Sequence, residues 1–176
     1  FGIHQSLETE VVAVRKMLSL CPQAKETPLI QDSKFAKKLS VREIWIKDER
    51  DRMGLGSFKA LGGVYVIASD AHNLDSADIY TSLKGVTYVA ASAGNHGISV
   101  AAGARIFGAK AVIFLSNSVP EIYERKLKKK DALVFRIGNT YEASMLEARR
   151  VSEERGWKLI SDSSWHGYTK VPRKIM

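Results

Sequence analysis

The chain has little cysteine and no long apolar run. Cys21 is the only cysteine among 176 residues, which excludes an intrachain disulfide framework and a cysteine-based metal site. No segment reaches the roughly 20 apolar residues that a membrane-spanning helix needs. Residues 1–4 also lack the basic and apolar succession of a signal peptide. We therefore expect a cytoplasmic protein with no membrane partner and no metal.

Nucleotide-binding motifs are also missing. The sequence contains neither the G-x-G-x-x-G dinucleotide fingerprint nor the G-x-x-x-x-G-K-[ST] phosphate loop. Both motifs cradle phosphates with backbone N–H groups, so their absence argues against a nucleotide enzyme of either class.

Acidic residues are fewer than basic ones, 19 against 27, and the formal net charge of +8 raises the question of nucleic acid. The densest basic run, residues 125–130, has no aromatic residue on which a base could stack. On a helix, positions 125, 128 and 129 would share a solvated face, and Leu127 and Tyr123 would point elsewhere. We therefore do not expect nucleic acid as a partner, and the excess charge suits an anionic cofactor and substrate.

Short β-branched segments alternate with amphipathic helices along most of the chain. The expected strands are residues 43–47, 86–91, 111–115, 133–137 and 158–161. The expected helices are residues 7–20 with Ser6 as cap, 34–39, 57–71 with Ser57 as cap, 95–107, 121–130, 141–155, and a last one that starts near Pro172. This alternation predicts an α/β fold, in which parallel sheets carry helices on both faces.

One candidate for chemistry is the lysine in Ser57-Phe58-Lys59, at the start of an expected helix. A lysine held among apolar neighbours can lose its proton and form an imine with an aldehyde. Gly62-Gly63, one turn later, leaves room for a flat group to lie against the helix or for a strand to pack closely. Taken alone, a lysine that opens a helix is more commonly a solvated side chain.

A second candidate is the loop Ser92–Gly97, which joins a buried strand to a helix. The free N–H groups and the dipole of a helix N-terminus suit a carboxylate or a phosphate. Ligands of open α/β sheets bind at the carboxyl ends of strands, where this loop lies. Considered singly, Asn95 is most simply a helix cap and His96 a hydrogen-bonded, partly buried residue.

The ordered combination of segments resembles a known family. Thr27-Pro28-Leu29, Ile46–Glu49, Ser57–Gly63 and Ala91–Gly97 occur in the order found in the tryptophan-synthase-β-like (fold type II) pyridoxal-phosphate enzymes. Residues 162–172 look most like those of diaminopropionate ammonia-lyases, with threonine dehydratases as the nearer general relatives.

The resemblance implies a domain organisation. Residues 1–84 would be the N-terminal part of the large cofactor-binding domain, and residues 85–176 would be a smaller α/β domain. Family members continue well beyond Met176 with a Gly-rich loop for the cofactor phosphate, so the remainder of the large domain would be absent. We therefore expect weak cofactor binding and no useful turnover from these 176 residues.

The resemblance also implies a site. Lys59 would hold pyridoxal 5'-phosphate and then move protons at the substrate Cα, Phe58 would pack beside the cofactor, and Asn95 would donate a hydrogen bond to its ring oxygen. The substrate carboxylate would be bound by the loop residues Ser92, Ala93, Gly94, Asn95 and His96. The implied reaction is α,β-elimination of 2,3-diaminopropionate to pyruvate and ammonia, by a protein that is a homodimer in its full-length form.

Two features keep alternatives open. Ala93 stands where the ammonia-lyases commonly have an aspartate, which favours a serine or threonine dehydratase instead. Asp162 is the remaining carboxylate in a family-like context; it could assist the β-leaving group as a second catalytic residue, or it could simply form a turn. A non-catalytic truncated relative that acts as an interaction module is the third alternative.

Overall fold

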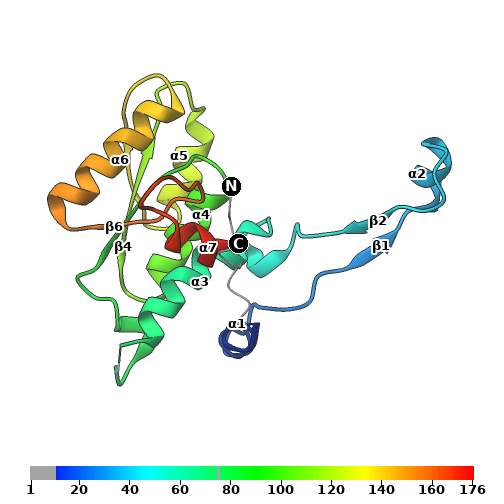
Figure 1. Cartoon of the computed structure of the whole chain (residues 1–176), viewed down its shortest axis with the longest axis horizontal. Coiled ribbons are helices and arrows are strands. Elements are labelled where there is room, and N and C mark those ends of the chain that lie inside the picture. The colour runs from blue at the N-terminus through cyan, green and yellow to red at the C-terminus, as the bar shows by residue number, and fades with distance from the viewer. Residues whose placement is uncertain (1–10, 75) are drawn as a thin grey trace.

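The body of the protein is a four-stranded parallel sheet between helices (Figure 1). The computed structural model describes residues 11–74 and 76–176. The strands lie in the order β5-β4-β3-β6, namely β3 (Thr87–Ala91), β4 (Lys110–Leu115), β5 (Leu133–Arg136) and β6 (Lys158–Leu159). The helices of the body are α3 (Lys59–His72), α4 (Asn95–Ile106), α5 (Glu121–Lys128), α6 (Tyr141–Arg155) and α7 (Lys170–Ile175). The predicted α/β fold with a parallel sheet is confirmed.

Helices cover both faces of this sheet because successive side chains of a strand point to opposite sides. Tyr88 and Ile113 belong to the core that also contains residues of α3 and α4. Val89 and Phe114, the next residues along the same strands, pack with Ala148 of α6 instead. Every residue of β3 is buried, as expected for a central parallel strand.

Helices α3 and α4 approach each other closely through small residues. A Cβ at Gly63 would lie 2.8 Å from the Cβ of Ser99 in α4, and one at Gly62 would overlap the backbone of Ile175 in α7. The space beside the two glycines is therefore filled by helices. This corrects the idea that Gly62-Gly63 leaves room for a flat group or a strand.

An antiparallel arm projects from the body (Figure 1). It consists of β1 (Leu29–Gln31), the short helix α2 (Ser33–Lys38) and β2 (Trp45–Lys47). The predicted strand 43–47 contains the whole of β2, and the predicted helix 34–39 corresponds to α2, but no strand was predicted where β1 lies. The arm carries exposed large apolar side chains, namely Leu29, Ile30, Phe35, Leu39, Val41, Trp45 and Ile46.

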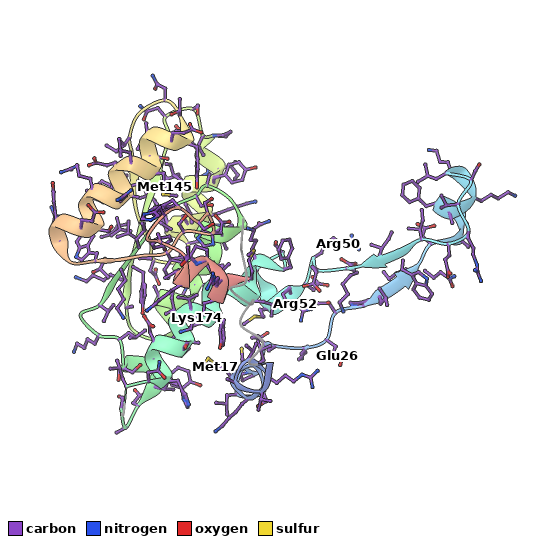
Figure 2. All side chains as sticks on the ribbon, viewed as in Figure 1. Met17, Glu26, Arg50, Arg52, Met145 and Lys174 are labelled. Carbon is purple, nitrogen blue, oxygen red and sulfur yellow. The ribbon has the colours of Figure 1, made fainter. Side chains whose placement is uncertain are left out.

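A polar network holds the base of the arm, where Figure 2 labels Arg52. Arg52 donates to both carboxylate oxygens of Glu49, at 2.6 and 2.7 Å, and to Thr27 Oγ1 at 2.7 Å. Thr27 donates in turn to Glu49 at 2.5 Å. The bond from Arg52 lowers the pKa of Glu49 to about 2, so this carboxylate is ionised at neutral pH.

The starts of two helices differ from the sequence predictions, and the start of a third is not tested. Helix α1 (Val11–Ser19) is described from residue 11, so the proposed cap Ser6 lies outside the described residues. Phe58, not Ser57, occupies the cap position of α3, although Ser57 Oγ accepts the N–H of Lys59 at 3.3 Å. The last helix starts at Lys170 rather than at the predicted Pro172.

The basic run lies on α5 and the residues after it. Leu127 is fully buried, while Arg125 and Lys128 are exposed and pair with Glu121 and Glu124 at 3.2 and 2.7 Å. The prediction that Leu127 turns away from a solvated cationic face is confirmed. The remaining short helices are η1 (Arg52–Gly54) and η2 (Ile79–Thr81).

The described residues include neither a membrane-spanning helix nor a metal-binding cluster. No helix in that part of the chain combines the length and apolarity needed to cross a membrane. Nor does any group of three or more His, Cys, Asp or Glu side chains there have a metal-binding arrangement. The predicted division near residue 84 stays a prediction.

Replacing Gly63 with alanine should destabilise the fold. The new methyl group would overlap the Ser99 side chain between two packed helices, and such overpacking costs about 1–3 kcal/mol. Urea unfolding followed by circular dichroism measures the loss. Ser99→Gly in the same chain removes the overlapping side chain, so the double variant should lose less than the sum of the two single variants. An unchanged unfolding midpoint for Gly63→Ala would contradict the packing.

Candidate functional site

Three segments that are distant in sequence meet at the carboxyl edge of the sheet. Lys59 opens α3, the loop 92–94 follows β3, and Asp162 comes shortly after β6. Lys59 Nζ donates to Asp162 Oδ2 at 2.6 Å across 103 residues of sequence separation. The two side chains are 33% and 25% exposed, so the pair lies in a partly open site. The structure therefore brings together the two residues predicted to be catalytic.

Opposing effects act on the pKa of the Asp162 carboxyl group. Burial would raise its pKa, but the hydrogen bond from Lys59 and the electrostatic interactions with His96 and Lys59 outweigh it, so the pKa lies below the ordinary value of 3.8. Asp162 is thus a carboxylate at neutral pH, and it gives Lys59 a charged partner. This corrects the expectation that mainly apolar neighbours surround the lysine amine.

His96 is 4% exposed and lies in the first turn of α4. Its Nε2 is 3.0 Å from the carbonyl oxygen of Ile160, which can only accept, so Nε2 carries the proton of this bond. Its Nδ1 is buried and has no hydrogen-bond partner. A buried polar atom without a partner is uncommon, and here it lies beside the loop predicted to bind an anion.

The loop Ser92–Gly97 is shaped by its glycines. A Cβ at Gly97 would overlap the carbonyl oxygen of Ser92, so only glycine lets the loop fold onto the first turn of α4. A Cβ at Gly94 would meet no atom within 4 Å, so the loop faces open space there. The first N–H groups of a helix have no acceptor inside it and remain able to bind an anion. The cap position belongs to Gly94, not to Asn95 as the simplest interpretation had it.

Phe58 and Asn95 line one cleft of about 570 Å³, which extends to the base of the arm. The Phe58 ring is 60% exposed, and its centroid lies 5.9 Å from Lys59 Nζ. Ala93, in contrast, packs against the main core and offers no proton-transfer group. The predicted cofactor residues therefore share one cleft beside the lysine.

The sequence interpretation missed the groups that surround Asp162. Burial raises the pKa of the Tyr141 phenol, and the negative charge of Asp162 raises it further against an opposing hydrogen bond with Ser163. Tyr141 was treated only as the start of a helix, although it follows the carboxyl end of a strand as the other site loops do. This position after a strand end could have indicated from the sequence that Tyr141 lies near the site.

A tyrosine also fixes the segment that carries Asp162. The Tyr168 hydroxyl accepts the N–H of Ser161 at 2.9 Å and donates to the carbonyl of Leu159 at 2.8 Å. Its ring stacks on Trp165 with centroids 4.2 Å apart. Burial raises the pKa of Tyr168 to about 12, so it remains a neutral donor. These hydrogen bonds hold the backbone of residues 159 and 161, directly before Asp162.

Comparison with known proteins identifies relatives of the whole described fold. A family described as "Pyridoxal-phosphate dependent enzyme" matches residues 20–175. Diaminopropionate ammonia-lyase of Salmonella typhimurium is 32% identical over 180 residues, which cover 95% of this chain and 44% of that protein. A chloroplastic threonine dehydratase of Solanum lycopersicum is 32% identical over 138 residues, which cover 78% of this chain and 21% of that protein.

Solved structures agree with these matches. The crystal structure of holo diaminopropionate ammonia-lyase from Escherichia coli superposes with a TM-score of 0.85 and 28% identity, covering 96% of this chain and 46% of that one. The chain thus spans less than half the length of the ammonia-lyases that it matches.

Replacing Lys59 with methionine should destabilise the protein in a pH-dependent way. The variant leaves a half-buried carboxylate without its partner, which costs about 1–2 kcal/mol for a pair that solvent partly screens. Because the pKa of Asp162 is lowered in the folded state, the stabilisation is present above 3.8 and is lost as pH falls through the lowered value.

Urea unfolding at a series of pH values checks this expectation. The difference between the unaltered protein and Lys59→Met should be largest near neutral pH and should shrink below pH 3.8. The double variant Lys59→Met/Asp162→Asn is the control, since it removes both charges and should recover part of the loss. A difference that does not vary with pH would argue against the ion pair.

Proposed function

Because the chain belongs to the pyridoxal-phosphate dependent enzyme family, we propose that the protein is an ammonia-lyase that converts 2,3-diaminopropionate to pyruvate and ammonia by α,β-elimination. The observation that carries the proposal is the contact of Lys59 with Asp162 beside the exposed Phe58 ring. The similarity to diaminopropionate ammonia-lyases supports this substrate.

The cofactor of this family is pyridoxal 5'-phosphate, and the residues of the cleft fit it. Phe58 supplies an uncovered aromatic ring and Asn95 an amide on the wall of this cleft, and Lys59, whose Nζ lies 5.9 Å from the centroid of the Phe58 ring, supplies the amine. When bound, the cofactor supplies an electron sink that makes the Cα proton of an amino acid acidic.

The chain's own residues then divide the remaining work. The N–H groups at the start of α4 bind the substrate carboxylate. Lys59 Nζ takes the proton from the substrate Cα. Asp162 holds that amine by its hydrogen bond and lies where it can assist departure of the β-amino group.

A dehydratase acting on serine or threonine is the second candidate. Ala93 favours it, since an alanine that packs against the core cannot supply an acid or base. The 32% identity with a threonine dehydratase gives it further support. Both candidates use the same lysine and the same loop and differ in the β-substituent that leaves.

The location, metabolic role and oligomeric state of the protein are further proposals. We propose a cytoplasmic role in amino-acid catabolism, which the single cysteine and the enzyme relatives support. We further propose that the protein is a homodimer in its full-length form. The exposed apolar side chains of the arm support an interface, and light scattering of the purified protein measures the stoichiometry.

Borohydride reduction should attach the cofactor permanently to Lys59. Incubation of the full-length protein with pyridoxal 5'-phosphate should give an absorbance band near the visible edge, and peptide mass spectrometry after reduction should find the added mass on the peptide with Lys59. Lys59→Ala should show no such adduct. Lys84→Ala is the matched control, because this lysine lies in a loop away from the site. If Lys59→Ala still formed the reduced cofactor adduct, Lys59 would not be the residue that binds the cofactor covalently.

In the full-length protein, release of 2-oxo acid should be fastest from 2,3-diaminopropionate. A coupled assay with that substrate, serine and threonine separates the two candidate reactions, and Asp162→Asn should slow all of them by roughly 100-fold if Asp162 acts in proton transfer. A clear preference for serine or threonine would favour the dehydratase and would contradict the proposed substrate.

A further inference from the structure

We propose that a basic groove between α3, β6 and α7 binds a small organic phosphate. The groove has a volume of about 670 Å³ and is separate from the cleft that contains Phe58. Four cationic residues line it, namely Lys158, Lys170, Arg173 and Lys174. Asp70 is the one carboxylate among the described residues of its wall, so a clear positive excess remains there.

The carboxylate in the groove is already engaged. Asp70 Oδ2 accepts from the Tyr88 hydroxyl and from Lys158 Nζ, each at 2.8 Å. Lys158 Nζ also lies 5.8 Å from the Tyr88 ring centroid. Asp70 therefore contributes little toward neutralising the cations of α7.

The cations of α7 converge on one side of that helix. Residues 170, 173 and 174 have the spacing that places side chains on a common face, and Figure 2 labels Lys174 there. Among the ion pairs of the described residues, none involves Lys170 or Lys174. These two ammonium groups are available to an anion that enters the groove.

The floor of the groove is apolar. Val66 and Ile160 are 4% and 1% exposed, and the Tyr88 ring lies beside them. A phosphate monoester carries up to two negative charges near neutral pH, and lysine is a common phosphate ligand. An organic phosphate matches the site better than a free inorganic anion, because its body can cover the apolar floor.

The groove lies away from the candidate active site. Asp70 is 11 residues after Lys59 in the same helix, which corresponds to about 16 Å along its axis. Tyr88 and Lys158 stand near the beginning of β3 and β6, whereas the active-site loops follow the ends of the strands. The groove is therefore a second site, independent of the proposed catalysis.

Isothermal titration calorimetry with AMP as the probe tests the proposal on the purified protein. AMP should bind saturably and more weakly as salt is added, because the contacts are ionic. Lys170→Glu and Lys174→Glu should each weaken AMP on the order of tenfold, since each reverses a charge next to the phosphate. Lys129→Glu, an exposed residue after α5 that changes the net charge equally, should leave AMP binding unchanged.

Each other outcome has a definite meaning. Equal binding of adenosine would overturn recognition of the phosphate, and equal binding of inorganic phosphate would overturn recognition of the organic body. If Lys129→Glu weakened AMP binding as much as Lys170→Glu and Lys174→Glu do, the net charge of the protein alone would explain the loss. That result would also overturn the proposed site.

The variant Lys59→Ala should bind AMP as the unaltered protein does, so a failure of the proposed catalysis leaves this test intact. Circular dichroism of every variant confirms that the fold is retained.

Discussion

The ion pair between Lys59 and Asp162 is the contact on which the rest of the site depends. It connects the start of α3 to the segment after β6, and the two residues are 103 positions apart. Each partner is positioned by its own surroundings: α3 by its close packing on α4 and α7, and Asp162 by the hydrogen bonds of Tyr168 to the neighbouring backbone. The pair also keeps Asp162 ionised, so the lysine meets a charged partner, and both side chains are partly exposed.

The sheet and its helices could be predicted from the sequence because their signals are local. Buried β-branched strands such as Val86–Ala91 and helices bounded by glycine are defined by short patterns. Strand β1 was missed because Leu29–Gln31 follows Pro28 directly and contains a single β-branched residue, whereas the equally short and exposed β2 lies in the run Ile44-Trp45-Ile46. The role of Gly62 and Gly63 was also hidden, because their neighbours Ile175 and Ser99 come from helices far away in the chain.

The residues of the site also differ in whether the sequence could predict them. Lys59 and the Ser92–Gly97 loop were identifiable because each opens a helix with a distinctive composition. Their relation to Asp162 was not, since periodicity carries no information on which loops meet across a sheet. The unpartnered Nδ1 of His96 and the charge of Asp162 acting on Tyr141 likewise depend on tertiary packing alone. Lys59 and the Ser92–Gly97 loop thus form one site only through tertiary contacts.

The most direct test of this account is a ¹³C NMR titration of the Asp162 carboxyl carbon, assigned by comparison with Asp162→Asn. The account predicts a pKa below 3.8 in the unaltered protein, because Lys59 and His96 stabilise the carboxylate, and a higher pKa in Lys59→Met, where burial is no longer opposed by the lysine. An ordinary pKa that does not respond to Lys59→Met would contradict the ion pair and the site built on it.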